Sequence, residues 1–99
     1  MTLTDLLRLT VEMDGSDLHL ATDTPPQMRV HGNLQRLAGA PLTPADTRAL
    51  ACSVLTDAQK KRFDETQELD FVFGIRGLAR FRGNLFSQRG AVGAVFRLI

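Results

Sequence analysis

Three arginines near the end of the sequence, Arg80, Arg82 and Arg97, are the residues whose type and spacing could do chemistry. Arg82 and Arg97 lie in two strand-like segments separated by Arg89-Gly90, a dipeptide suited to a two-residue hairpin turn. If that dipeptide forms the turn, counting back along both strands places Arg82 opposite Arg97. Planar guanidinium groups match the oxygens of phosphate. The pair therefore predicts a phosphate-binding site, with Arg80 as a secondary member.

The other face of the same hairpin is predicted to be apolar, which supports this register. Gly83 falls opposite Phe96, where a missing side chain leaves room for a neighbouring ring. A shift of one residue would move the arginines to the buried face. The remaining expected pairs on this face are Phe81 with Leu98, Leu85 with Ala94 and Ser87 with Val92.

The preceding hairpin is expected to bring a carboxylate to the arginines. A three-residue loop, Ile75-Arg76-Gly77, would pair Phe71 with Phe81 and Asp70 with Arg82. Three cations then share one carboxylate, and like charges on neighbouring strands repel, so the excess positive charge needs solvent or an anion. The alternative is that the exposed arginines only keep the sheet soluble and protect its edges.

Other chemistry is not indicated. No GxxxxGK[ST] phosphate loop occurs, so this chain alone is not expected to hydrolyse ATP. His19 and His31 form no recognisable metal set with Asp17 or Asp23, and no metal is assigned. Cys52 is expected to be an inert thiol buried on an amphipathic helix, and no serine has the context of a nucleophile.

Composition sets the class of protein. With 99 residues, 43% of them hydrophobic, the chain is predicted to form one domain with a single core. Twelve basic and eleven acidic residues give a net charge of +1, so neither nucleic-acid nor membrane-surface binding is indicated. No apolar run approaches the roughly 18 residues of a membrane span, and no signal peptide is indicated. The single cysteine fits a reducing compartment, and a cytoplasmic location is expected.

Changes in hydrophobic period and capping residues predict an α+β fold, an antiparallel sheet of about six strands with helices packed on one face. In residues 16–20 the leucines should face the core, with Asp17 and His19 on the other face. The expected elements are a helix from Leu3 that stops before Gly15, strands 16–20, 28–30 and 34–37, helices from Thr43 through Val54 and from Thr56 to about Thr66, and strands 69–75, 78–88 and 92–99.

Several spaced segments resemble the PilT-type twitching motility proteins, the pilus retraction members of the secretion ATPase superfamily. They are GSDLHL at 15–20, PPQMRVHG at 25–32, LTD at 55–57, ELDF at 68–71, ARFR at 79–82 with Asn84, and AVFR at 94–97. The resemblance implies a PAS-like domain that precedes a RecA-like ATPase domain in a hexameric ring, with ATP and Mg²⁺ held between the two. The family's phosphate-contacting arginines match Arg82 and Arg97. The family usually has a branched residue where Gly83 stands, which implies looser packing here.

By this resemblance, residues 1–99 are expected to be the regulatory, nucleotide-sensing N-terminal domain of a type IV pilus retraction ATPase. The C-terminal motor domain is expected to be absent, since the chain stops within the apolar segment 95–99. The implied partners are its own motor domain, that of the neighbouring subunit and platform proteins at the inner face of the bacterial inner membrane. The alternatives are a stand-alone PAS-like sensor with a small molecule in its core and a protein-interaction module.

Overall fold

Capping residues determine where all three helices begin. In the computed structural model, which describes residues 1–99, each helix begins with a capping box: Thr2 with Asp5, Thr43 with Asp46, and Thr56 with Gln59. The helices are α1 (Leu3–Glu12), α2 (Pro44–Cys52) and α3 (Asp57–Thr66), and the strands are β1 (Gly15–Leu20), β2 (Gln27–Val30), β3 (Asn33–Arg36), β4 (Glu68–Ile75), β5 (Ala79–Gln88) and β6 (Ala91–Leu98).

Element ends differ from the prediction by one or two residues, for local reasons. Helix α1 is ended by Asp14, which takes a left-handed conformation with φ 58°, so that Gly15 begins β1. Helix α2 stops at Cys52 because Ser53 caps it, donating its hydroxyl to the Leu50 carbonyl at 2.7 Å. The β2–β3 turn consists of His31 and Gly32, both with positive φ, as in tight hairpin turns.

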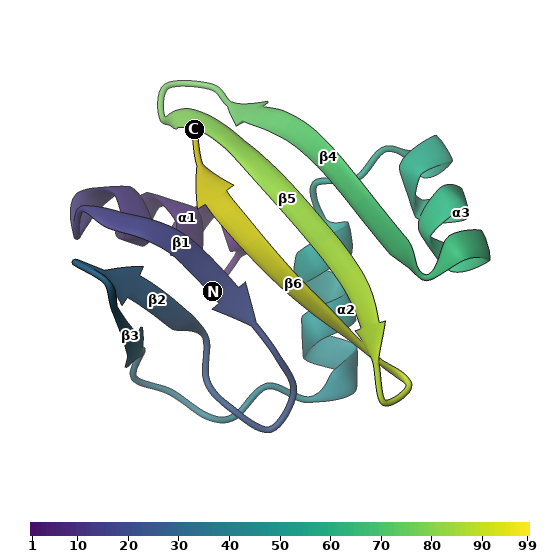
Figure 1. Ribbon diagram of the computed structural model, residues 1–99, viewed down its shortest axis with the longest axis horizontal. Helices are drawn as coiled ribbons and strands as arrows, with labels where there is room; N and C mark the ends of the chain where they lie inside the picture. The colour runs from purple at the N-terminus through teal and green to yellow at the C-terminus, as the bar shows by residue number, and fades with distance from the viewer.

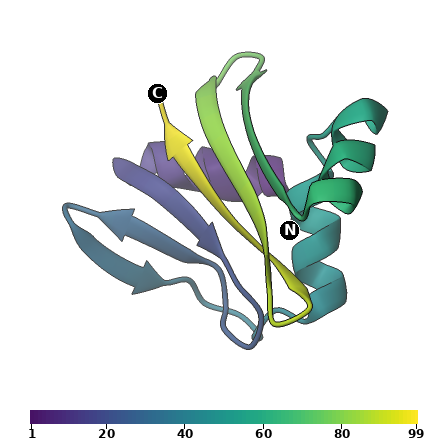
Figure 2. The same ribbon diagram turned by 45° about the vertical axis from the view of Figure 1, so that its right-hand side comes forward.

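The six strands form one antiparallel sheet in the order β3-β2-β1-β6-β5-β4 (Figure 1). All three helices lie on the same side of this sheet, and the opposite face carries none (Figures 1 and 2). The predicted α+β class and the single helical layer are confirmed. None of the helices is long and apolar enough to cross a bilayer.

The β5–β6 register is the predicted one, with Arg82 opposite Arg97 and Gly83 opposite Phe96. The predicted β4–β5 register is wrong by two residues. Phe71 pairs with Gly83 instead of Phe81, because the loop is Arg76-Gly77-Leu78, closed by the Leu78 amide donating to the Ile75 carbonyl at 3.0 Å. A shift of two leaves every side chain on its predicted face.

Buried side chains from the sheet and from all three helices form one hydrophobic core. No buried side-chain polar atom lacks a hydrogen-bond partner. The expected looser packing at Gly83 is wrong, because the rings of Phe71 and Phe96 fill the space above it. Cys52 is only half-buried, and burial raises the pKa of its thiol. The largest fully buried side chains include Phe63, Phe81, Phe96, Leu3, Leu7, Leu18, Leu20, Met28 and Leu85.

Candidate phosphate-binding site on the open face of the sheet

The arginine pair lies on the face that no helix covers. Arg82 and Arg97 are directly opposite each other on β5 and β6, and both are exposed. They line an open hollow of about 510 Å³ near the C-terminal end of β6. The other lining residues are Asp70, Phe71, Val72, Leu98 and Ile99.

Neither arginine of the pair has an acidic partner. The chain's three ion pairs, with a nitrogen and an oxygen within 4.0 Å, involve other cations, so Arg80, Arg82 and Arg97 are all unpaired. Asp70, predicted to face Arg82, instead faces Asn84, whose side-chain amide donates to its carboxylate at 2.9 Å. The open face therefore has guanidinium donors without an acceptor from the protein.

Arg80 is less favourably placed than the other two. It faces Gly74 on β4 and does not line the arginine hollow, but another hollow beside the β4–β5 loop. The structure thus brings two of the three predicted arginines together. The wall beside them is apolar, since Val72 lies opposite Arg82 and is 51% exposed.

Sequence reasoning missed a carboxylate next to this pair. Asp17 is directly opposite Arg97 on the β1–β6 boundary and opposite Arg29 on the β1–β2 boundary. It lies on the open face as predicted, but its exposure is only 3%. The residues in direct register across four strands are thus Arg29, Asp17, Arg97 and Arg82.

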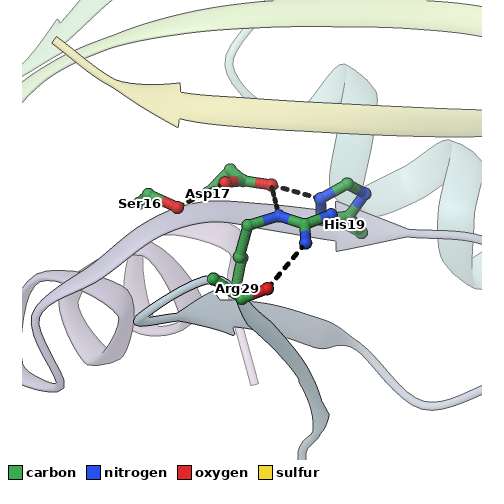
Figure 3. Close-up of polar contacts among 5 residues, drawn as sticks. Ser16, Asp17, His19 and Arg29 are labelled. Carbon is green, nitrogen blue, oxygen red and sulfur yellow. Dashed lines mark hydrogen bonds and ion pairs between the residues drawn. The ribbon is translucent and has the colours of Figure 1, made fainter.

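Three neighbours hold the Asp17 side chain (Figure 3). The Ser16 hydroxyl donates to Oδ1 at 2.6 Å, the His19 ring contacts Oδ2 through Nε2, and Nε of Arg29 lies 3.5 Å from the same oxygen. Burial alone would raise the pKa of Asp17. Hydrogen bonds from Ser16 and His19, with the charges of His19 and Arg29, outweigh burial, so its pKa lies below the ordinary value.

A β-bulge makes this arrangement possible. Gly15 pairs with Val30 but Asp17 pairs with Arg29, so Ser16 is an extra residue on β1. Ser16 is thereby placed where its hydroxyl reaches Asp17. A hydrophobic alternation pattern predicts which residues share a face but not an inserted residue, so the GSDLHL segment gave no signal of the bulge.

The low pKa of Asp17 predicts a pH effect on stability. Its charge stabilises the fold at neutral pH, and that contribution is lost as pH falls below about 4. Asp17→Asn is therefore expected to flatten the fall in unfolding free energy between about pH 4 and 2. Urea unfolding of both chains across this range measures the difference, which is informative because Asp5 and Asp46, whose pKa values are also lowered, are present in both. Parallel curves would contradict the prediction.

The other candidates do not converge. His31 lies in the β2–β3 turn, separate from His19 on β1, and no group of three or more His, Cys, Asp or Glu side chains is arranged to hold a metal.

The fold and the hollow define a small α+β domain whose open sheet face presents two neighbouring arginines without an acidic partner. No protein-family model matches the chain. It is 42% identical over 99 residues to the type IV pilus retraction ATPase PilT of Pseudomonas aeruginosa, covering 100% of this chain and 29% of that protein. It is 42% identical over 94 residues to the pilus ATPase PilU of the same organism, covering 95% of this chain and 25% of PilU.

A solved structure agrees with these relatives. The crystal structure of the pilus retraction motor PilT with bound ADP superimposes with a TM-score of 0.92 at 37% identity, covering 100% of this chain and 29% of that one. Over its whole length the chain corresponds to the N-terminal region of the PilT-type pilus ATPases. It spans less than a third of the length of the relatives it matches.

Proposed function

We propose that this domain senses nucleotide for a type IV pilus retraction ATPase, with Arg82 and Arg97 contacting the phosphates of ATP. The observation that carries the proposal is the position of these two arginines, opposite each other in one hollow and without a carboxylate partner. Hydrogen bonds from a guanidinium to phosphate oxygens are charge-assisted and often bidentate. Two converging guanidinium groups suit a polyphosphate better than a singly charged ligand.

The ATP would be held at a cleft between this domain and a RecA-like motor domain that follows it in the whole protein. The motor domain would supply the phosphate loop and hold the Mg²⁺ that accompanies ATP, since the hollow here has a single acidic side chain, Asp70, already bonded to Asn84. The residues of this chain bind and orient phosphate oxygens. An arginine from a separate domain couples the presence of the γ-phosphate to the angle between the domains.

In this proposal the domain works in a homo-hexamer, contacting its own motor domain and that of the neighbouring subunit. The whole ATPase acts in the cytoplasm at the inner face of the inner membrane, on platform proteins of the pilus, and its work is pilus retraction in twitching motility. The names of the relatives, a retraction ATPase and a pilus ATPase, support this assignment.

A stand-alone sensor with a small molecule in its core has less support. Such a sensor needs internal space, but Phe71, Phe73, Phe81 and Phe96 pack together there, with ring centroids 5.3 to 5.9 Å apart. These rings fill the interior beside β4, β5 and β6, whereas an apolar hollow of about 600 Å³ lies between α1, α2 and residues 37–42.

Nucleotide affinity tests the proposed contacts. In the protein joined to its motor domain, Arg82→Gln and Arg97→Gln are each expected to weaken ATP binding about tenfold or more, because each removes a charge-assisted contact worth about 1.5–3 kcal/mol. Isothermal titration calorimetry under non-hydrolysing conditions measures the dissociation constants. Arg80→Gln should have a smaller effect, since Arg80 lies outside the hollow.

The matched control is Arg89→Gln. It removes the same charge from the β5–β6 turn, at the other end of the hairpin. ATP affinities that are equal in the Arg82, Arg97 and Arg89 variants would contradict the phosphate contacts.

A further inference from the structure

Asp17 is a buried carboxylate on a sheet face that has no covering helix (Figures 1 and 3). Because no helix lies there, the cover comes from neighbouring side chains. Its register neighbour on β6 is Arg97, one of the two arginines of the hollow. An anion beside a phosphate-binding cation competes with the phosphate for it.

The competition is geometrically possible. Directly opposed residues on antiparallel strands have Cβ atoms about 4.5–5.5 Å apart, well within the reach of an arginine side chain. Opposite charges in this position normally pair. Yet no nitrogen of Arg97 lies within 4.0 Å of a carboxylate oxygen.

Both oxygens of Asp17 are already occupied. Oδ1 accepts from Ser16, and Oδ2 meets His19 and Arg29 (Figure 3). The Arg29 guanidinium is itself anchored, because its Nη1 donates to the Gly32 carbonyl in the β2–β3 turn at 3.2 Å. Arg29 comes from β2, on the side of β1 away from β6, whereas Ser16 and His19 belong to β1 itself.

The backbone of β1 at Gly15 and Ser16 has an unusual geometry that allows the contacts of Asp17. Ser16 is the bulged residue, and Gly15 before it allows β1 to approach its neighbours closely. A Cβ at Gly15 would lie 3.0 Å from Cγ of Met28 and 3.1 Å from the Arg29 carbonyl oxygen. The group thus depends on a local geometry that an ordinary strand would not provide.

We propose that Ser16, His19 and Arg29 act as positioning residues that hold Asp17 away from Arg97 and so keep the Arg97 guanidinium available for phosphate. This inference rests on the proposed phosphate contacts and adds to them. It assigns the GSDLHL segment a role in ligand binding through Asp17, although none of its residues lines the arginine hollow.

The inference predicts effects of opposite sign on anion binding. Asp17→Asn removes a negative charge next to Arg97 and should tighten binding of tripolyphosphate, the anionic part of ATP, by about threefold, because that charge repels the anion even when Asp17 is not paired with Arg97. Arg29→Gln releases Asp17 to pair with Arg97 and should weaken binding by a similar factor. In the Asp17→Asn background, Arg29→Gln should change the affinity little, since there is no carboxylate left to release.

This double-mutant cycle separates positioning from the general loss of charge. If Arg29 acted only as a distant positive charge, its replacement would weaken binding equally in both backgrounds. Titration of the 99-residue chain with tripolyphosphate, followed by the side-chain Nε–Hε NMR signals of Arg82 and Arg97, gives the four dissociation constants. Equal effects of Arg29→Gln in both backgrounds would overturn the inference.

A second measurement does not depend on phosphate binding. Without any anion, the pKa of Asp17 is followed by carbon-13 NMR in the wild-type chain, Arg97→Gln, Arg29→Gln and the double variant. Replacing Arg97 should raise the Asp17 pKa more in the Arg29→Gln background than in the wild type, because only there does Arg97 pair with Asp17. Equal shifts in both backgrounds would overturn the inference.

The two measurements distinguish a failure of the proposed phosphate contacts from a failure of the proposed positioning of Asp17. If tripolyphosphate moves neither arginine signal, the proposed phosphate contacts fail, while the Asp17 titration still decides whether Arg97 is kept free. If Arg29→Gln loses the dispersed amide spectrum of the folded chain, Ser16→Ala replaces it, because Ser16 is exposed and loses only its hydroxyl donor to Asp17. The same expectations and the same contradicting outcomes apply to that variant.

Discussion

Under the proposed function, Arg97→Gln in the protein joined to the proposed motor domain is expected to reduce ATP turnover about a hundredfold or more. The reason is that charge on the γ-phosphate oxygens is stabilised during phosphoryl transfer, and an arginine supplied for this purpose contributes at least that factor. Arg82 faces Arg97 in the same hollow, so Arg82→Gln should act in the same direction. Steady-state phosphate release at saturating ATP measures the effect.

The double variant and a control make this result interpretable. If both arginines contact one phosphate chain, the double variant should lose less than the product of the single losses, because residues that act as a unit are not additive. Arg89→Gln, in the distant turn, should retain nearly full turnover. Unchanged turnover in both single variants would refute a role for the arginine pair in hydrolysis.

Gly83→Val is expected to destabilise the chain by about 1–3 kcal/mol, the usual cost of overpacking a core. A Cβ at Gly83 would lie 2.7 Å from two ring atoms of Phe71, closer than real Cβ contacts, and 3.2 Å from a ring atom of Phe96, which is a tight contact. Both rings are buried in the core. Urea unfolding followed by circular dichroism measures the loss of unfolding free energy. Thermal unfolding should show a fall in Tm of about 5–20 °C.

Gly74→Ala is the matched control for this prediction. Gly74 lies on the neighbouring strand β4, and a Cβ there would meet only Cγ of Arg80 at 3.7 Å, an ordinary contact. It should change the stability much less than Gly83→Val. Phe71→Leu combined with Gly83→Val should recover part of the loss, because a smaller side chain vacates the space that valine needs. Equal stability of Gly83→Val and the wild type would show that the rings move aside freely.

Hydrophobic period and local capping chemistry were sufficient to predict most of the architecture. The three capping boxes depend on residues three positions apart, and the face of each strand depends on alternation, so both can be deduced from the chain itself. The Arg89-Gly90 turn sets the β5–β6 register, and that register places Arg82 opposite Arg97. The arginine pair was therefore predictable from local sequence.

The β4–β5 register could not be obtained in this way. Two three-residue loops, Ile75-Arg76-Gly77 and Arg76-Gly77-Leu78, both contain Gly77, which has the positive φ of 76° that either loop needs. The choice between them depends on whether Phe71 packs over Gly83 or opposite Phe81, and this is decided by the whole core. Local turn chemistry leaves both registers open.

By itself, the sequence determined the α+β class, the helix starts, the face of each strand and the opposition of Arg82 and Arg97, because these follow from interactions between residues close along the chain or across one tight turn. Only the tertiary structure decided that β1 inserts between β2 and β6. That insertion places Asp17 between Arg29 and Arg97, which lie 68 positions apart in the sequence. Strand order depends on burying the common core, and no local pattern encodes which distant strands will meet.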